Sequence, residues 1–394
     1  MRGIAALVVV LNHAFDGFLP RYSGLDYGHL GDRLQGSVLY LLINGSAAVT
    51  FFFVLSAYIL TRRYCLSGDT TILLKGAIKR WPRLTGPIFA AVMVSYLLFF
   101  FHLYHFEEAG ARSGSEWLVV FAGAFRQPGG PPITAAAIHW PDALLQGLFL
   151  TLFRGDWRFD SSLWTMKFEF IGSFIAFGLA PILREARRYA SYLVISIAVL
   201  AIAILYFAYF TRSEMAAFPA GVAMAALIPR DAHLSRAVVF PAVLISLFLM
   251  GYPGDPIGAY AMFKGLTALG MPFAYPQIAG AAILILAVEM SPDLRRMLSG
   301  RFAAFLGGLS FPIYLLHALV IASIGSWVYL RAGVLPAFAA VFAVSTVASL
   351  PLMKFNDWWV GRVNALASRI VPAKAALPPA GSSETALASQ AAGP

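Results

Sequence analysis

The sequence predicts an all-α protein, a polytopic bundle of about ten membrane-spanning helices with both termini in the cytoplasm. Composition is the first of three observations behind this prediction. Hydrophobic residues make up 59% of the 394-residue chain and charged residues only 12%, about half the charged fraction of a typical soluble domain. A large part of the surface must therefore face lipid instead of water.

The second observation is the number of long apolar segments. A helix needs about 20 mostly apolar residues to cross a bilayer, and ten segments approach or meet that length: 3–20, 44–62, 84–104, 161–183, 189–210, 215–229, 237–251, 274–290, 303–324 and 333–353. The two between residues 215 and 251 are the shortest. A further apolar run from Asp142 to Phe153 has only 12 residues, so we expect it to lie in the interface or to re-enter the membrane.

The third observation is the distribution of basic residues. If the N-terminus is cytoplasmic, 19 of the 29 Lys and Arg residues lie on the inner side, 9 lie on the outer side, and Lys167 lies within a span. Because positive charge resists translocation, this asymmetry favours a cytoplasmic location for both termini. It also accounts for the net charge of +10 without a nucleic-acid partner.

The domain organisation is simple. Residues 1–371 form one transmembrane domain, and the Ala/Pro/Ser-rich residues 372–394 form a tail that we expect to be disordered. The outer segment 105–160 is long and rich in Gly, Pro and Trp, which is typical of a functional loop or lid. The single cysteine, Cys65, cannot form an intramolecular disulfide.

Among the ionisable residues inside the predicted spans, three stand out: His13, Glu169 and His317. Such groups are costly in a membrane and mark functional sites. Their distances from the inner membrane face are about 15, 18 and 21 Å, at 1.5 Å per helical residue, which predicts one shared polar site in which Glu169 pairs with His13. As alternatives, His13 could be a histidine bonded to a neighbouring helix, and Glu169 could form a salt bridge with a nearby Lys or Arg. For His317 we expect a structural or supporting role.

Arg2 precedes His13 by eleven residues, which on a helix places both on nearly the same face, about 16.5 Å apart. A ligand that touches both needs an anionic end at the inner surface and a reactive end within the membrane, and an acyl-CoA thioester has this form. Lys79, Arg80 and Arg83 in the basic loop before the third span would bind its phosphates. Alternatively, these residues are basic only because cytoplasmic loops generally carry an excess of Lys and Arg, or because they bind anionic lipid.

Motifs for other chemistries are missing from the sequence. It contains no GxGxxG, Walker or GxSxG pattern, so nucleotide-binding and hydrolase functions are not supported. His102 and His105 are three residues apart, but no third ligand is fixed near them, so we predict no metal site.

Five stretches resemble, in order, the motifs of the acyltransferase 3 family of integral membrane proteins. They are the R-x10-H pattern of residues 2–13, FFFVLS at 51–56, KRWPR at 79–83, SLWTMKFE at 162–169 and LSFPIYLLH at 309–317. Four positions depart from the usual motifs: Thr50, Ala57, Lys167 and Phe311.

This resemblance implies about ten transmembrane helices and the transfer of an acetyl or other short acyl group from cytosolic acyl-CoA. The acceptor would be a hydroxyl of a sugar, a polysaccharide or a lipid-linked glycan. The resemblance also assigns Arg2 and the basic residues 80–83 to the acyl donor, His13 to the catalytic centre and Glu169 to the support of His13.

The mechanism that we predict uses His13 as a general base oriented by Glu169, with direct attack of the acceptor on the thioester. A transient acyl-imidazole is a second route. The oxyanion or substrate contacts could come from Ser56, Trp164, Tyr314 or His317.

Two other functional classes fit part of the sequence. A proton-coupled transporter or flippase for a glycolipid or small molecule would also place His and Glu within the membrane, although the sequence shows no repeated halves. A membrane sensor or scaffold would leave the shared depth of the ionisable residues unexplained. In each case we expect a multi-pass protein, with the bacterial cytoplasmic (inner) membrane as its location.

Overall fold

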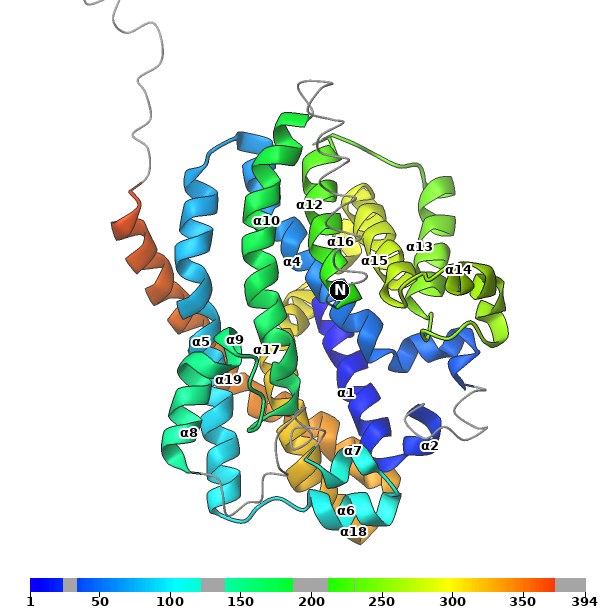
Figure 1. Cartoon of the computed structure of the whole chain (residues 1–394), viewed down its shortest axis with the longest axis vertical. Coiled ribbons are helices and arrows are strands. Elements are labelled where there is room, and N and C mark those ends of the chain that lie inside the picture. The colour runs from blue at the N-terminus through cyan, green and yellow to red at the C-terminus, as the bar shows by residue number, and fades with distance from the viewer. Residues whose placement is uncertain (24–33, 122–138, 187–211, 230, 373–394) are drawn as a thin grey trace, which may run out of the picture.

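The structure is a computed structural model, and it describes residues 1–23, 34–121, 139–186, 212–229 and 231–372. The predicted span 189–210 and almost all of the predicted tail lie outside these ranges. Within them every regular element is a helix, which confirms the predicted all-α class (Figure 1).

Long helices form the body of the molecule, and short helical segments connect them. The longer helices are α1 (Arg2–Phe18), α4 (Gly45–Ser67), α5 (Thr71–Phe100), α10 (Met166–Ala186), α12 (Ala217–Leu227), α13 (Arg236–Met250), α15 (Ala274–Glu289), α17 (Arg301–Val320) and α19 (Val334–Ile370). The short segments used below are α6 (Phe106–Ser113), α7 (Glu116–Val119), α8 (Trp140–Leu145), α9 (Thr151–Phe153), η4 (Ser161–Thr165), α16 (Pro292–Leu298) and α18 (Ser326–Ala332), with the π-helices η3 (Gln146–Leu150) and η7 (Ile321–Gly325). The remaining ones are α2 (Pro20–Ser23), η1 (Val38–Ile43), η5 (Ser213–Ala216), η6 (Gly258–Phe263) and α14 (Lys264–Ala268).

The helices are long and apolar enough for a multi-pass membrane protein. Five helical segments of the described chain qualify as spans, and the number rises to six if α15 and α16, which meet at a bend of 96°, count as one. Two shorter apolar helices, Ser213–Leu227 and Arg236–Met250, correspond to the two shortest predicted spans. The count of ten and the cytoplasmic location of both termini stay predictions.

Two helices extend well beyond their predicted spans. α5 begins at Thr71, so Lys79, Arg80 and Arg83 lie on a helix and the predicted basic loop is wrong. α19 continues to Ile370, and its 37 residues correspond to about 55 Å, which exceeds the apolar core of a bilayer. Hydropathy detects only the part of a helix that lies in lipid, whereas backbone hydrogen bonding continues into polar sequence.

The outer segment is largely helical where it is described. It contains α6 and α7, and the run from Asp142 to Phe153 forms α8, η3 and α9. α8 and η3 pack against α5, so this part of the outer segment is docked on the helical body. We refer to the described part of this segment, residues 105–121 and 139–160, as the outer cap, after its predicted side; it is folded where the sequence suggested a functional loop or lid.

Close helix packing positions α1, which carries two of the predicted functional residues. α1 packs against α17 and α4. At Gly3 the backbone of α17 approaches so closely that a Cβ atom would lie 2.7 Å from the carbonyl oxygen of Leu306. Only glycine leaves room for this approach. Farther along the same two helices His13 contacts His317, so α1 and α17 run in the same direction.

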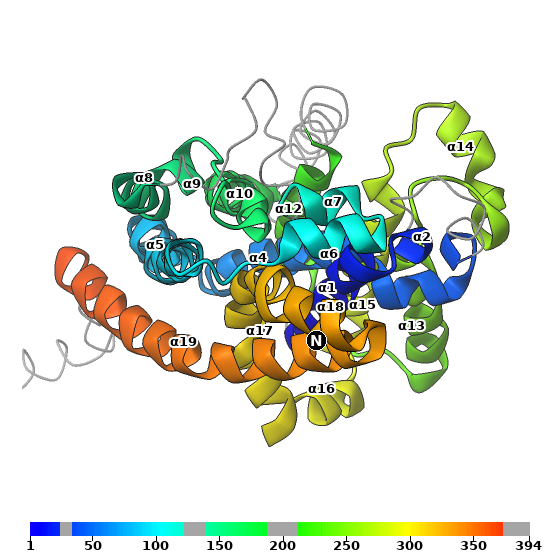
Figure 2. The same cartoon turned by 90° about the horizontal axis from the view of Figure 1, so that it is seen from below.

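The outer cap is fastened to the end of α1 opposite its N-terminus, where Figure 1 shows α6, α7 and α18 gathered together. Ser115 Oγ donates to the carbonyl of Asp16 at 2.6 Å, and Ser113 Oγ donates to that of Gly17 at 2.7 Å. The backbone N–H of His105 donates to Ala322 of η7 at 3.0 Å. Figure 2 shows α19 passing along α17 toward α5 on another side of the bundle.

Candidate active site

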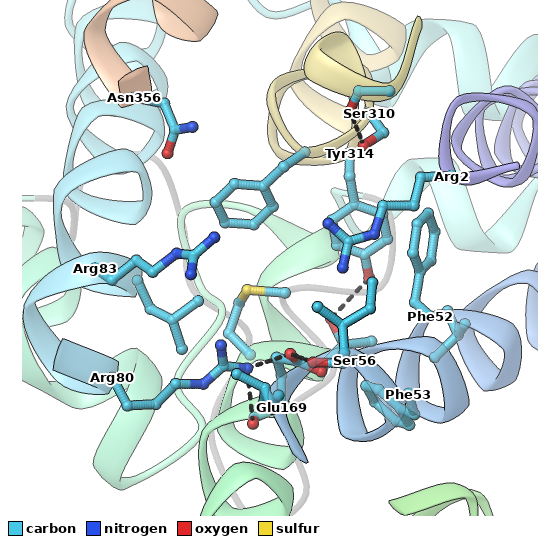
Figure 3. A pocket seen from close by; sticks show the side chains of 18 of the residues that line it. Arg2, Phe52, Phe53, Ser56, Arg80, Arg83, Glu169, Ser310, Tyr314 and Asn356 are labelled. Carbon is cyan, nitrogen blue, oxygen red and sulfur yellow. Dashed lines mark hydrogen bonds and ion pairs between the residues drawn. The ribbon is translucent and has the colours of Figure 1, made fainter. Parts of the chain in front are cut away.

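A pocket of about 290 Å³ lies where α1, α4, α5, η4, α10, α17 and α19 meet. Its lining is mixed. The polar side chains are Arg2, Ser56, Arg80, Arg83, Thr165, Glu169, Ser310, Tyr314, Asn356 and Asp357, and apolar ones such as Phe52, Phe53 and Phe311 complete the wall. Figure 3 shows Arg2, Arg80, Arg83, Glu169 and Tyr314 around this space.

Three guanidinium groups converge on the pocket. Arg2 is the first residue of α1, and Arg80 and Arg83 are three residues apart on α5, which places them on one helix face. Arg80 is buried and ion-paired with Glu169. Within the described part of the chain, Arg2 and Arg83 have no hydrogen-bond or ion-pair partner, so their donors are available to an anion. Three of the four residues that we predicted for the donor therefore lie together.

The predicted pairing of Glu169 with His13 is wrong. The carboxylate of Glu169 accepts instead from Arg80 and from Ser56 Oγ, the latter at 2.5 Å. The alternative of a salt bridge with a nearby basic residue is thus confirmed. His13 has a different partner: its Nδ1 lies 2.7 Å from Nε2 of His317.

Helix register explains why Glu169 and His13 do not meet. Thr165 Oγ1 lies 2.8 Å from the hydroxyl of Tyr314, which fixes α10 and α17 relative to each other. From this contact Glu169 is one turn toward the pocket residues Gly307 and Ser310, whereas His317 is one turn in the opposite direction. The two residues are thus separated by about 10 Å along the bundle at 1.5 Å per residue. The depth estimate failed because the spans do not begin at a common plane.

The two histidines lie on the side of the site where α7 packs against α1. His317 is completely buried, and its Nδ1 lies 2.7 Å from the carbonyl oxygen of Tyr314. The ring of Trp117 on α7 lies 5.0 Å from that of His13, measured between centroids. His13 is therefore placed between His317 and the outer cap.

The pocket does not reach His13 itself. Tyr314 is the lining residue nearest to His317 along α17, and its hydroxyl also donates to the carbonyl of Ser162 at 3.1 Å. The ring of Tyr314 is 5.8 Å from that of His317. One aromatic side chain thus stands between the pocket and the pair of histidines.

Four other predicted residues divide into two groups. Ser56 and Tyr314 line the pocket. Lys79 and Trp164 do not: Lys79 Nζ donates to Asn364 on α19 at 3.1 Å, and the guanidinium of Arg212 lies 4.9 Å from the Trp164 ring centroid. Lys79 is therefore an α5–α19 contact, and the pocket gives no support to its predicted role in donor binding.

The sequence analysis missed three residues near the site. Asn356 and Asp357 on α19 line the pocket, and the only signal for them is that this polar pair directly follows an apolar run. Trp117 lies in the outer segment, and nothing in the sequence indicated that it would contact His13. All three are brought in by helix packing, which is not a local property of the sequence.

Asp160 caps the N-terminus of the short helix η4, which carries the pocket residue Thr165. Asp160 Oδ1 accepts from the N–H of Ser162 at 2.9 Å and from its Oγ at 2.7 Å. Oδ2 is buried without a hydrogen-bond partner in the described residues. Burial raises the pKa of Asp160 to about 7, because the charged form is poorly solvated there.

Comparison with known proteins assigns the chain to a family. The acyltransferase domain that defines the acyltransferase 3 family matches residues 1–354. No curated protein and no solved structure matches the chain significantly. Because the domain match covers most of the chain and its helices are long enough to cross a bilayer, this protein belongs to the acyltransferase 3 family and is a multi-pass membrane acyltransferase.

Proposed function

We propose that this protein transfers an acetyl or other short acyl group from cytosolic acyl-CoA to a hydroxyl group of a sugar, a polysaccharide or a lipid-linked glycan. The observation that carries the proposal is the position of Arg2 and Arg83. Their guanidinium groups face a pocket whose far end, at Tyr314, is one ring away from the His13–His317 pair. This arrangement, with two arginines at the pocket and the histidine pair beyond Tyr314, matches a donor with phosphates at one end and a reactive thioester at the other.

The pocket favours binding of the donor in an extended form. A volume of about 290 Å³ is at the lower limit for sites that hold drug-sized molecules. We infer that the pantetheine arm occupies the pocket and that the phosphates remain at its mouth. Arg2 and Arg83 can bind phosphate oxygens bidentately, while Arg80 is neutralised by Glu169.

His13 is the general base in this proposal. It takes the proton of the acceptor hydroxyl as the hydroxyl oxygen forms a bond with the thioester carbonyl carbon. The Tyr314 hydroxyl, which donates to the Ser162 carbonyl in the structure, would turn its proton from that carbonyl to the developing oxyanion. The carbon–sulfur bond then breaks, the thiolate of coenzyme A takes the proton from His13, and the products are the O-acyl ester and free coenzyme A.

The acceptor would approach His13 from the side of the outer cap. The indole of Trp117 lies against the His13 ring there, so an acceptor that reaches the imidazole from this side would pass Trp117. A cytosolic donor and an acceptor on the opposite face would thus meet at His13. For a bacterial protein this geometry corresponds to the modification of cell-envelope glycans at the inner membrane.

The test uses the full chain in lipid nanodiscs, with radiolabelled acetyl-CoA as donor and n-octyl β-D-glucopyranoside as a defined sugar hydroxyl. We expect acetylated glucoside by mass spectrometry and an equal amount of free coenzyme A. Parallel proteoliposomes measure proton-driven uptake of the glucoside. Uptake without any consumption of thioester would refute the proposal in favour of the transporter that the sequence left open.

A further inference from the structure

The contact between His13 and His317 has an informative geometry. The ring centroids are 5.0 Å apart and the planes differ by 10°, while Nδ1 of His13 is 2.7 Å from Nε2 of His317. The distance from the centre of an imidazole ring to its nitrogen is counted once for each ring. Added to the 2.7 Å between the two nitrogens, it equals the 5.0 Å between the centroids. Both nitrogens therefore lie on the line between the ring centres, and the rings meet edge to edge in nearly one plane, as an N–H···N hydrogen bond requires.

The second nitrogen of His317 decides the direction of this hydrogen bond. Nδ1 of His317 lies 2.7 Å from the carbonyl oxygen of Tyr314 and 3.2 Å from that of Ile313. A carbonyl oxygen can only accept, so Nδ1 of His317 must carry the proton. In a neutral ring Nε2 is then a bare acceptor, and Nδ1 of His13 must donate to it. The remaining nitrogen of His13, Nε2, consequently has a free lone pair.

Both rings are expected to be neutral. His317 has no exposed surface, and an isolated imidazolium in such surroundings would be poorly solvated. The nearest acid along α1 is Asp16, whose carboxylate accepts from the amide of Asn12 at 3.1 Å and 3.2 Å. Glu169 is engaged by Arg80 and Ser56. Neither carboxylate has a hydrogen bond to either imidazole.

We propose that His317 is the positioning residue for His13: a backbone carbonyl of α17 fixes the tautomer of His317, and His317 in turn holds His13 with Nε2 as the reactive base. This rests on the proposed function and deepens it, because it names the atom that takes the acceptor proton. His317 has the place that a carboxylate has in a Ser–His–Asp triad. Because His317 is neutral, it orients His13 and stabilises the imidazolium by a hydrogen bond, without adding a negative charge.

The tautomers can be tested without activity, by NMR of ¹⁵N-histidine-labelled protein in nanodiscs. The chain has seven histidines, and the signals of the pair are assigned by their loss in His13→Gln and His317→Gln. We expect both rings to be neutral with the proton on Nδ1. In His317→Phe, which fills the space but cannot accept, the His13 signal should change toward a mixture of tautomers. A His13 ring protonated on Nε2 in the wild-type protein would overturn the proposal.

Kinetics of the same variants test the consequence for the reaction. We expect His317→Phe to lower kcat on the order of a hundredfold, the scale of one general-base contribution, with KM for acetyl-CoA within twofold of wild type. Gln has an amide oxygen that can accept from His13, so the kcat of His317→Gln should be about tenfold higher than that of His317→Phe. Equal losses in both variants would indicate a role in packing alone and would contradict the proposal.

The experiments distinguish failure of the proposed acyl transfer from failure of the proposed role of His317. Wild-type protein that binds acetyl-CoA but never consumes the thioester would refute acyl transfer, whereas the NMR result would still report the tautomers. Wild-type turnover that His317→Phe leaves within threefold would refute only the role of His317.

Discussion

Arg80 on α5 and Glu169 on α10 form an ion pair in the wall of the pocket, and the side chains of both residues are largely buried. Ser56 Oγ on α4 donates to the same carboxylate oxygen at 2.5 Å. Three helices are thus joined at one carboxylate. The pair also neutralises one of the three pocket arginines, so that Arg2 and Arg83 alone are left to bind an anion. Glu169 therefore shapes the pocket electrostatically and does not orient His13.

We expect Glu169→Gln to destabilise the protein by about 3–5 kcal/mol, because it leaves the Arg80 guanidinium buried without a counter-charge. The midpoint of thermal unfolding in nanodiscs measures the effect. The double variant Arg80→Met with Glu169→Gln removes both charges and should recover most of the loss. If the double variant unfolds at the same temperature as Glu169→Gln, the ion pair is not the cause.

Removal of either free arginine should weaken donor binding. For Arg2→Gln and Arg83→Gln we expect KM for acetyl-CoA to rise on the order of tenfold, the scale of one charge-assisted hydrogen bond, with kcat little changed. Lys75→Gln is the matched control, since Lys75 is on the same helix as Arg83 but does not line the pocket. An equal KM increase in Lys75→Gln would point to a general effect of inner-face charge.

His13→Gln should abolish turnover. We expect kcat to fall at least on the order of a thousandfold, within the range for loss of a general base, while acetyl-CoA still binds because its phosphates are held by Arg2 and Arg83. Isothermal titration checks binding, and release of coenzyme A checks turnover. His102→Gln, at an exposed histidine next to α5, should behave as wild type. Undiminished turnover in His13→Gln would remove His13 from the chemistry.

Trp117→Ala should raise hydrolysis of acetyl-CoA relative to transfer to the glucoside. The indole lies against the His13 ring, and its removal should give water more access to the base. We expect the ratio of free coenzyme A to acetylated product to increase several-fold. Trp327→Ala is the control, because Trp327 is partly exposed on α18 and stacks with Arg331. An unchanged ratio in Trp117→Ala would show that the cap does not shield His13 through this residue.

Asp160 should make stability depend on pH. Its pKa is raised by burial to about 7 from a usual 3.8, so the folded state binds more protons than the unfolded state between these values. The free energy of unfolding should therefore fall as the pH rises from about 4 to about 7, by a few kcal/mol in total, and then stay level. In Asp160→Asn the decrease in the free energy of unfolding should be smaller than in the wild-type protein, whereas Glu108→Gln, at an exposed carboxylate, should retain the full decrease.

Sequence and structure agree best on properties that belong to a single helix. Arg2 and His13 were placed on one helix from their spacing, and both lie on α1. Arg80 and Arg83 share a face of α5 because they are three residues apart. The regular rise and rotation of an α-helix make such relations predictable from residue numbers alone. The family was likewise recognised from short motifs, and the domain match confirms it.

Relations between helices were predicted less well. The sequence contains His13, Glu169 and His317 but not the offsets of their helices, which depend on where each helix begins and on close contacts such as that of Gly3 with Leu306. A shift of one helix by two turns relative to its neighbour is enough to change which side chain lies opposite His13 or Glu169. The sequence by itself therefore determined the membrane class, the family and the set of polar residues. Only the tertiary structure decided that Glu169 pairs with Arg80 and His13 with His317, because side-chain hydrogen bonds act over about 3 Å whereas the register between helices varies by many ångströms.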